Sequence, residues 1–188
     1  RPGDIKYKDL NHDGVIDSND QAPIGYNPVP EMTFSLAAGM NWKGFDFSIL
    51  LQGAARSSIY LQQDIAWDNF WGNYYEEHIG RWTPETAATA TYPRFTKAAT
   101  AAHPNYYKSD YWLKDSKYLR LKNIQLGYTI PRKLLKKFGV RSLRVYANAY
   151  NLFTWDNVKK VDPESSNNSN GQFYPQQKVI NFGINLNF

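Results

Sequence analysis

Cysteine is absent from this 188-residue chain, and histidine occurs only three times. No disulfide framework, thiol nucleophile or cysteine-based metal site is therefore available. No apolar run approaches the roughly 18 residues that a membrane-spanning helix needs. The chain begins Arg1-Pro2, without an initiator Met or the charged and apolar regions of a signal peptide. We expect a processed or truncated piece of a longer protein.

Signatures of enzymes are also missing from the sequence. The histidines are scattered and form no H-E-x-x-H motif: His12, His78 and His103. Neither a phosphate-binding glycine loop nor a G-x-S-x-G elbow occurs. Three acidic residues could be imagined as glycosidase carboxylates, but acidic side chains in loops are usually only solvated: Glu76, Glu77 and Glu85. We predict that the protein is not an enzyme.

Aromatic residues, in contrast, are abundant. They make up 16% of the chain, as 14 Tyr, 10 Phe and 6 Trp. Two explanations compete, a carbohydrate- or peptide-binding surface and aromatic girdles at membrane interfaces. The net charge of +5 is not gathered into a basic stripe, and no RNA-binding signature is present. We expect a solvated basic surface and no nucleic-acid partner.

The segment 178–188, K-V-I-N-F-G-I-N-L-N-F, alternates strictly between two kinds of residue. One face is wholly apolar and the other is small or amide-bearing, which is the period of a β-strand. Its length suits a tilted membrane-spanning strand of roughly 9–11 residues. The aromatic last residue, Phe188, is typical of the terminus of bacterial outer-membrane barrel proteins. The segment predicts a barrel strand with one face toward lipid and the other toward an aqueous lumen.

The same alternation recurs along the chain and predicts five strands: 32–42, 45–53, 118–130, 141–153 and 178–188. The phase slips near Lys122-Asn123, which predicts a β-bulge. Short connections at 43–44 and 131–140 alternate with long ones at 54–117 and 154–177. Outer-membrane barrels alternate short periplasmic turns with long extracellular loops in this way. In the second short connection, Pro131 and Gly139 predict the start and stop of one or two helical turns.

Aromatic residues fall near both ends of the predicted strands, as interfacial girdles require. The inner set is Trp42, Phe45, Tyr128 and Phe188, and the outer set is Trp112, Tyr118, Phe153 and Trp155. Five strands cannot close a barrel, since the smallest barrels have about eight. An open sheet edge is forbidden in a bilayer, so strands outside this chain must complete the structure.

One motif carries ligand chemistry, the segment 9–20 with the calcium-loop pattern D-x-N-x-D-G. Oxygens at calcium-loop spacing would come from Asp9, Asn11, Asp13, Val15 (through its carbonyl), Asp17 and Asp20. The alternative is an Asn/Asp/Gly turn whose side chains bond their own backbone. We predict a structural calcium ion within an extracellular segment 1–31, followed by barrel strands and loops over 32–188.

Several segments together resemble one family. They are 2–17 (P-G-D-I-K-Y-K-D-L-N-H-D-G-V-I-D), 118–131 (Y-L-R-L-K-N-I-Q-L-G-Y-T-I-P), 143–155 (L-R-V-Y-A-N-A-Y-N-L-F-T-W), 161–164 (V-D-P-E) and the closing G-I-N-L-N-F. In this order the chain resembles the C-terminal part of SusC/RagA-type TonB-dependent outer-membrane transporters of Bacteroidota. The resemblance implies a 22-stranded barrel with an N-terminal plug, which is missing here. It also implies a SusD-like surface lipoprotein as a lid, energy from the TonB–ExbB–ExbD complex, and import of glycans or peptides.

The long loop 54–117 is the best candidate for substrate binding, because aromatic faces stack on sugars and on peptide side chains. The candidate residues are Trp67, Trp71, Tyr74, Tyr75 and Trp82. These rings could instead pack the loop against itself or against the lid. The family's variable regions, 54–117 and 165–176, leave the substrate undetermined. The alternative to a transporter is a structural or adhesive barrel, or a calcium-stabilised binding module that never transports.

Overall fold

The structure is a computed structural model that describes residues 1–97, 100, 102–159, 161–165 and 174–188. Small parts of the two predicted long loops, at 98–99, 101, 160 and 166–173, lie outside the described residues. The chain divides into two compact units, which we describe separately. The loop unit is built from Arg1–Pro28 and Ser58–Asp115. The sheet unit is built from Val29–Ser57, Ser116–Glu164 and Tyr174–Phe188.

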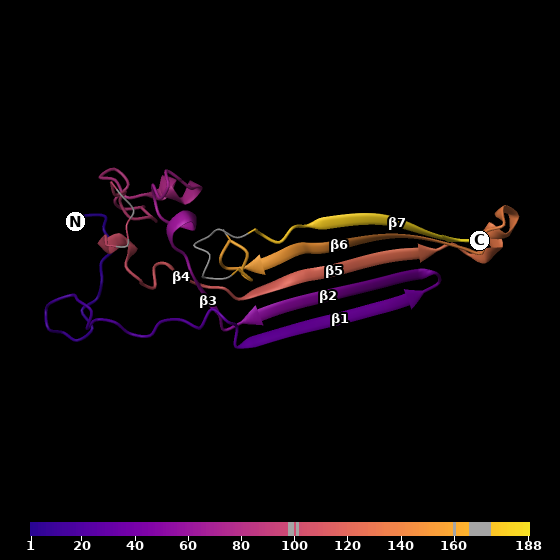
Figure 1. The fold of residues 1–188 in the computed structure, drawn as a ribbon, viewed down its shortest axis with the longest axis horizontal. Coiled ribbons are helices and arrows are strands. Elements are labelled where there is room, and N and C mark those ends of the chain that lie inside the picture. The colour runs from indigo at the N-terminus through magenta and orange to yellow at the C-terminus, as the bar shows by residue number, and fades with distance from the viewer. Residues whose placement is uncertain (98–99, 101, 160, 166–173) are drawn as a thin grey trace. The chain divides into compact units, whose positions relative to one another are not determined.

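A single antiparallel sheet of five strands forms the sheet unit, in the order β1-β2-β5-β6-β7 (Figure 1). The strands are β1 (Met32–Trp42), β2 (Phe45–Ala55), β5 (Tyr118–Thr129), β6 (Ser142–Asp156) and β7 (Val179–Asn187). The predicted all-β class and its five strands are confirmed. Both β2 and β6 run past their predicted ends at 53 and 153.

Both short connections adopt the geometry that their residues predict. Lys43 and Gly44 have φ angles of 48° and 92°, and Trp42 pairs with Phe45 across them. Two positive φ values define the tight hairpin turn whose twist matches the strands, and glycine adopts its second position without strain. The other connection holds α1 (Arg132–Leu135) and η4 (Lys136–Phe138), and it ends at Gly139 with φ 68°. The predicted helical turns are confirmed.

The predicted bulge in β5 is present at Lys122. Leu121 pairs with Leu51 of β2, whereas Asn123 pairs with the adjacent Leu50. Lys122 is therefore the extra residue on this side of the ladder. On the other side the register also shifts, between Leu121 and Asn123. The bulge brings Leu119 and Leu121 onto the same face of the sheet as the even-numbered residues from Ile124 onward.

The loop unit has its own secondary structure, where the sequence predicts a single loop over 54–117. A two-stranded sheet pairs β3 (Ser58–Tyr60) with β4 (Leu113–Asp115). Among the described residues between them lie three short 3-10 helices: η1 (Gln63–Ile65), η2 (Glu76–Gly80) and η3 (Pro104–Tyr106). No helix in the described part of the chain is long and apolar enough to cross a membrane.

Residues near the N-terminus complete the loop unit. The carboxylate of Asp4 lies 2.7 Å from Nε of Arg94 and accepts a hydrogen bond from Nδ2 of Asn105. The backbone N–H of Ile5 donates to Oδ1 of Asn105 at 2.9 Å. Burial raises the pKa of Asp4, but the terminal ammonium and Arg94 outweigh it and lower the pKa below its ordinary value. These contacts fix the position of the chain directly before the segment 9–20.

Candidate functional site

The two faces of the five-stranded sheet differ in chemistry. The paired positions on one face are apolar on every strand, among them Leu36, Ile49, Ile124, Ala147 and Phe182. Phe182 is 83% exposed, although it occupies the middle of β7. A soluble protein rarely exposes a contiguous apolar surface of this extent. We call this surface the apolar face.

The opposite surface, the polar face, carries amides, hydroxyls and charged pairs. Asp46 of β2 and Arg144 of β6 form a two-pronged ion pair, with Nε to Oδ1 at 2.9 Å and Nη2 to Oδ2 at 2.5 Å. They reach each other across β5 at Gly127, where a Cβ atom would lie 2.5 Å from both Nη2 of Arg144 and Oδ1 of Asp46. Glycine at 127 therefore leaves the space that the ion pair occupies.

A denser charged cluster on the polar face surrounds Arg120 of β5, which is 2% exposed. Its guanidinium donates to Oδ1 of Asp162 at 2.8 Å, to Oε2 of Glu164 at 3.1 Å and to Oγ1 of Thr154 at 2.9 Å. The hydroxyl of Tyr118 also donates to Glu164, at 2.5 Å. The segment V-D-P-E (161–164) is thus bound to the sheet through a buried arginine.

The carboxyl of Asp162 is held in its charged form. Burial alone raises the pKa of Asp162, but hydrogen bonds from Arg120 and from the backbone N–H of Glu164 outweigh burial and lower it. A charge-assisted, hydrogen-bonded pair of this kind is stronger than a neutral contact. The loop that follows β6 therefore has a fixed attachment on the polar face.

The structure separates the predicted substrate-binding residues into buried and exposed members. Trp67 is 3% exposed, and its ring packs 4.7 Å from that of Tyr106. Trp82 is half-buried and lies against Gly3. Trp71 is 80% exposed, and Tyr74 and Tyr75 are also exposed. The loop unit thus uses Trp67 and Trp82 in its own packing and leaves the other three rings accessible.

Asp68 organises the interior of the loop unit, which sequence reasoning did not foresee. It is 1% exposed, and its Oδ1 accepts hydrogen bonds from the hydroxyls of Tyr106 and, at 3.3 Å, of Tyr92. Its Oδ2 accepts the backbone N–H of Thr96 at 3.0 Å. Burial and the nearby carboxylate raise the pKa of both tyrosines, so they stay neutral donors. The available sequence signal for this role was an acidic residue, Asp68, directly after Trp67. The partners of Asp68 lie more than twenty residues away in the sequence, so the sequence alone does not identify them.

Most of the aromatic residues predicted to form interfacial girdles lie near the ends of the strands. Trp42, Phe45 and Tyr128 lie on the apolar face at the hairpin end, and Phe153 and Trp155 lie on it at the other end. The prediction was wrong for Trp112, which is buried in the loop unit and donates to the carbonyl of Asn105 at 2.8 Å. It was also wrong for Tyr118, which is buried and bonds Glu164 on the polar face. The bulge at Lys122 shifts the alternation of β5, so Tyr118 lies on the polar face, although its even number predicts the apolar face.

The predicted calcium loop folds around its own backbone. Asp9 accepts the N–H groups of His12 at 2.6 Å and Gly14 at 2.8 Å, and Asp20 accepts those of Leu10 and Asp17. Bonds from Asp17 and Leu10 lower the pKa of Asp20. Among the described residues, no three acidic or histidine side chains gather closely enough to hold a metal ion.

The oxygen donors of this loop nonetheless fit calcium in type, because Ca²⁺ takes carboxylate, amide and carbonyl oxygens. A carboxylate that accepts one or two N–H groups also keeps further lone pairs. Asn11, Asp13 and Asp17 bond their neighbours' N–H groups in the same way as Asp9, so the ligand geometry of Asp9, Asn11, Asp13, Val15, Asp17 and Asp20 stays a prediction.

No family model matches the chain, but its sequence is similar to those of several curated proteins. It is 30% identical, over 99% of its own length and 20% of the relative's, to TonB-dependent receptor P26 of Formosa agariphila. It is 27% identical, over all of its length and 18% of the relative's, to TonB-dependent receptor SusC of Bacteroides thetaiotaomicron. The chain thus spans about a fifth of the length of the curated relatives that it matches.

Solved structures give the same result for the fold. The chain superposes on part of the RagAB peptide importer in its open-open state with a TM-score of 0.69, at 23% identity, covering 93% of this chain and 19% of the other. A second RagAB structure gives a TM-score of 0.65. The resemblance drawn from the sequence is confirmed, since the chain is related over its whole length to TonB-dependent receptors that include SusC. These relatives are receptors and not enzymes.

Proposed function

We propose that this relative of the TonB-dependent receptors forms part of the wall of an outer-membrane transporter that imports oligosaccharides or peptides. The observation that carries the proposal is the contrast between the two faces of the sheet. One face is apolar on all five strands, and the other carries amides and the ion pair Asp46–Arg144. In a bilayer the apolar face contacts acyl chains and the polar face lines a water-filled lumen.

The rest of the transporter completes the barrel. β1 and β7 are the two edges of the sheet, and unpaired edge groups in hydrocarbon each cost several kcal/mol. Strands from the remainder of a longer protein therefore pair with both edges and close the 22-stranded barrel that the resemblance implies. The same remainder supplies the plug and the contact with the TonB–ExbB–ExbD complex.

The loop unit lies on the extracellular side in this proposal and meets substrate or a SusD-like surface lipoprotein. Trp71, Tyr74 and Tyr75 present exposed rings, and Ile79 of the same unit is also exposed. Aromatic faces stack on sugar rings and on peptide side chains alike. The structurally similar RagAB is named a peptide importer, which supports peptides as one proposed substrate class. Oligosaccharides are the second proposed class.

Depth measurements on the complete receptor in bilayers test the membrane placement. Spin labels at Phe182 and Ile184 should be relaxed by oxygen, which concentrates in the acyl region. Labels at Asn181 and Asn185, their neighbours on the polar face, should respond to a water-soluble relaxing agent. Water exposure at all four positions would refute the proposal.

Uptake assays with a maltooligosaccharide and a pool of short peptides test the role of the loop unit. We expect Trp71→Ala to reduce uptake of one of the two probes. Phe138→Ala is the matched control, because Phe138 is similarly exposed but belongs to the short turn of the sheet unit. Equal uptake by Trp71→Ala and the control would remove Trp71 from the binding surface.

Calcium binding by the segment 9–20 belongs to the same proposal, as a structural element of the loop unit. Calorimetric titration of the complete receptor should reveal chelator-sensitive binding that Asp9→Ala combined with Asp13→Ala abolishes. Glu85→Ala, at an acidic residue of the same unit but outside the loop, should bind normally. Unchanged calcium binding in the double variant would assign the ion elsewhere.

A further inference from the structure

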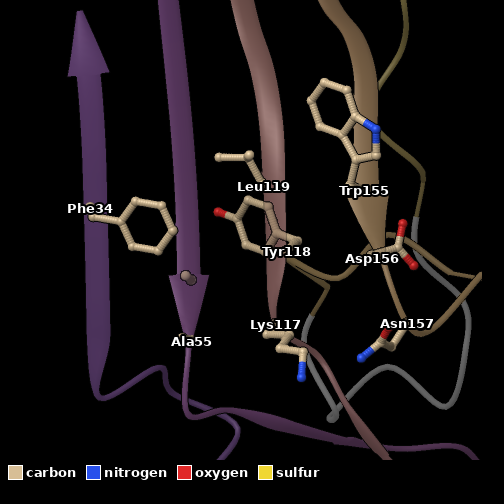
Figure 2. Close-up of a pocket in the computed structure, with 9 residues that line it drawn as sticks. Phe34, Ala55, Lys117, Tyr118, Leu119, Trp155, Asp156 and Asn157 are labelled. Carbon is tan, nitrogen blue, oxygen red and sulfur yellow. The ribbon is translucent and has the colours of Figure 1, made fainter.

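The exposed aromatic rings of the loop unit are held differently from those at a pocket of the sheet unit. That pocket lies at the end of the apolar face, between Phe34 of β1 and Trp155 of β6, and both residues belong to regular strands (Figure 2). Tyr74 and Tyr75 stand directly before η2 and belong to no strand. The directions of their rings therefore depend on side-chain contacts, and both rings contact His78.

His78 of η2 is 2% exposed and is surrounded by aromatic rings. Its ring centroid lies 6.1 Å from that of Tyr74 and 5.6 Å from that of Tyr75, both in edge-on contacts. It also contacts Tyr92 at 4.6 Å and Phe95 at 5.8 Å. The imidazole thus joins the two exposed tyrosines to the interior of the loop unit.

The hydrogen bonds of His78 identify its tautomer. Nδ1 accepts the backbone N–H of Tyr75 at 3.0 Å, so this nitrogen carries no proton. Nε2 lies 3.2 Å from the carbonyl oxygen of Ala66, which can only accept, so Nε2 carries the proton. Backbone groups therefore occupy both ring nitrogens, and the imidazole is neutral.

Protonation of His78 would break this arrangement. The imidazolium carries a hydrogen on both nitrogens, so Nδ1–H would face the N–H of Tyr75, and neither group could accept from the other. The carboxylate of Glu77 approaches Nε2, at 4.0 Å, so it does not replace the bond at Nδ1. A partly buried N–H that loses its partner costs free energy, and the start of η2 should therefore open.

Charged and titratable side chains also lie on the other elements around the imidazole. Tyr92 contacts it as a neutral phenol, because burial raises the pKa of Tyr92. The carboxylate of Asp68 accepts a hydrogen bond from the hydroxyl of Tyr92 at 3.3 Å. The guanidinium of Arg81 lies 4.9 Å from the centroid of Phe95, which also packs on His78, and it repels a second positive charge. The contact that protonation removes is thus the bond between Nδ1 and Tyr75.

We propose that neutral His78 positions Tyr74 and Tyr75 for substrate binding, and that this binding weakens when His78 is protonated. Histidine is the side chain whose charge ordinarily changes between about pH 5 and pH 8. His78 is a positioning residue, because it is buried and acts through its contacts with two exposed rings. This inference rests on the role in substrate binding proposed above for the loop unit.

Hydrogen exchange over 74–80 in the complete receptor tests the positioning, at about pH 7.5 and about pH 5, which bracket the charge change of histidine. After correction for the intrinsic effect of pH, we expect protection to fall in acid by on the order of tenfold, the effect of about one lost hydrogen bond. Binding of a maltooligosaccharide and of a pool of short peptides is measured on the same samples. The probe that depends on Trp71 should bind more weakly in acid.

Two substitutions at His78 separate positioning from mere packing. His78→Asn keeps an acceptor oxygen near the place of Nδ1 but does not titrate, so it should retain protection and binding at both pH values. His78→Leu has no acceptor and should lose both at either pH. His103→Asn is the matched control, because Nδ1 of His103 also accepts a backbone N–H, that of Asn105 at 3.1 Å, in the same unit. It should keep the acid response of the unmodified receptor.

An acid response that persists in His78→Asn, or that His103→Asn removes, would overturn the role of His78. The two proposals also fail separately. Normal binding of both probes by Trp71→Ala rejects the binding surface, whatever His78 does. Weakened binding by Trp71→Ala, combined with equal protection and equal binding by the unmodified receptor at the two pH values, rejects the role of His78 alone.

Discussion

The loop unit and the sheet unit place their large apolar side chains in opposite ways. In the loop unit, Trp67, Tyr106 and Trp112 are buried against one another. In the sheet unit, Phe182 and Ile184 are exposed although they lie within a regular strand. The first arrangement is a core formed in water. The second has its apolar side chains directed outward, which is stable only where the surroundings are themselves apolar.

Buried polar groups show the complementary difference. The loop unit buries Asp68 among tyrosine hydroxyls and a backbone N–H. The sheet unit buries Arg120 between two carboxylates on the polar face. Each unit satisfies its buried charge with hydrogen bonds, as burial demands. The units therefore obey the same rules for polar groups and differ in where they place their apolar groups.

The largest expected effect is in the loop-unit core. Trp67→Ala should destabilise the loop unit by about 3–5 kcal/mol, because it leaves a cavity beside Tyr106. Trp71→Ala, at the exposed tryptophan four residues away, should change stability by no more than about 0.5 kcal/mol. Hydrogen exchange of the backbone over 58–115 in the complete receptor measures both. Equal protection in the two variants would contradict the distinction between core and surface rings.

The next effect concerns the charged cluster of the sheet unit. Arg120→Met should cost about 3–5 kcal/mol, because Asp162 and Glu164 lose their buried partner. The lowered pKa of Asp162 has a further consequence. Its stabilisation is complete above the ordinary value of 3.8 and is lost as pH falls below that value through the lowered folded pKa.

Denaturation of the complete receptor at neutral and acid pH measures both effects of Arg120→Met. The variant should be less stable at neutral pH and should lose the acid sensitivity that Asp162 confers. Glu76→Gln, at an exposed acid of the loop unit, provides the control and should behave like the unmodified protein. An Arg120→Met variant of normal stability would show that the cluster does not hold the loop.

A pair of neighbouring substitutions tests the two faces of the sheet directly. Phe182→Arg should cost about 2–4 kcal/mol in a bilayer, because it places a cation against acyl chains near mid-depth. Asn181→Arg, one residue away on the polar face, should be tolerated. The folded fraction recovered in membranes, read from the mobility shift of folded barrels on gels, measures the difference. Similar losses for both would argue that the two faces meet the same solvent.

The smallest predicted effect is steric. Gly127→Ala should cost about 1 kcal/mol, because a Cβ atom would crowd the Asp46–Arg144 ion pair. Gly39→Ala is the control on the same sheet, where the nearest contact of an added Cβ is a carbonyl at 3.4 Å. Urea titration of the complete receptor compares them. A neutral Gly127→Ala would mean that the ion pair shifts aside without loss.

Much of the sheet unit could be predicted because its signals are local. Strict alternation located all five strands, and the slip in phase near Lys122 located the bulge. The residues Lys43-Gly44, Pro131 and Gly139 located both short connections. The prediction of which face a side chain occupies was wrong where the bulge in β5 interrupts the alternation. Tyr118 was assigned to a girdle, although the bulge directs it to the polar face beside Glu164.

The loop unit was far less predictable, because its contacts join residues distant in sequence. Trp112 packs on Tyr106 and Tyr92, and Asp68 bonds Tyr106, thirty-eight residues away. No periodicity marks such pairs in advance. Aromatic composition alone could not separate Trp67, a core residue, from Trp71, an exposed one.

By itself the sequence determined the two-faced strands, because a period of two sorts side chains onto opposite faces whatever the rest of the chain does. It also determined the tight hairpin, since only certain residues adopt positive φ without strain. Only the tertiary structure decided that Arg120 binds the segment 161–164, that Asp68 unites the loop unit, and that Phe34 and Trp155 border one pocket. These contacts depend on which strands and loops become neighbours, and that follows from long-range pairing and packing.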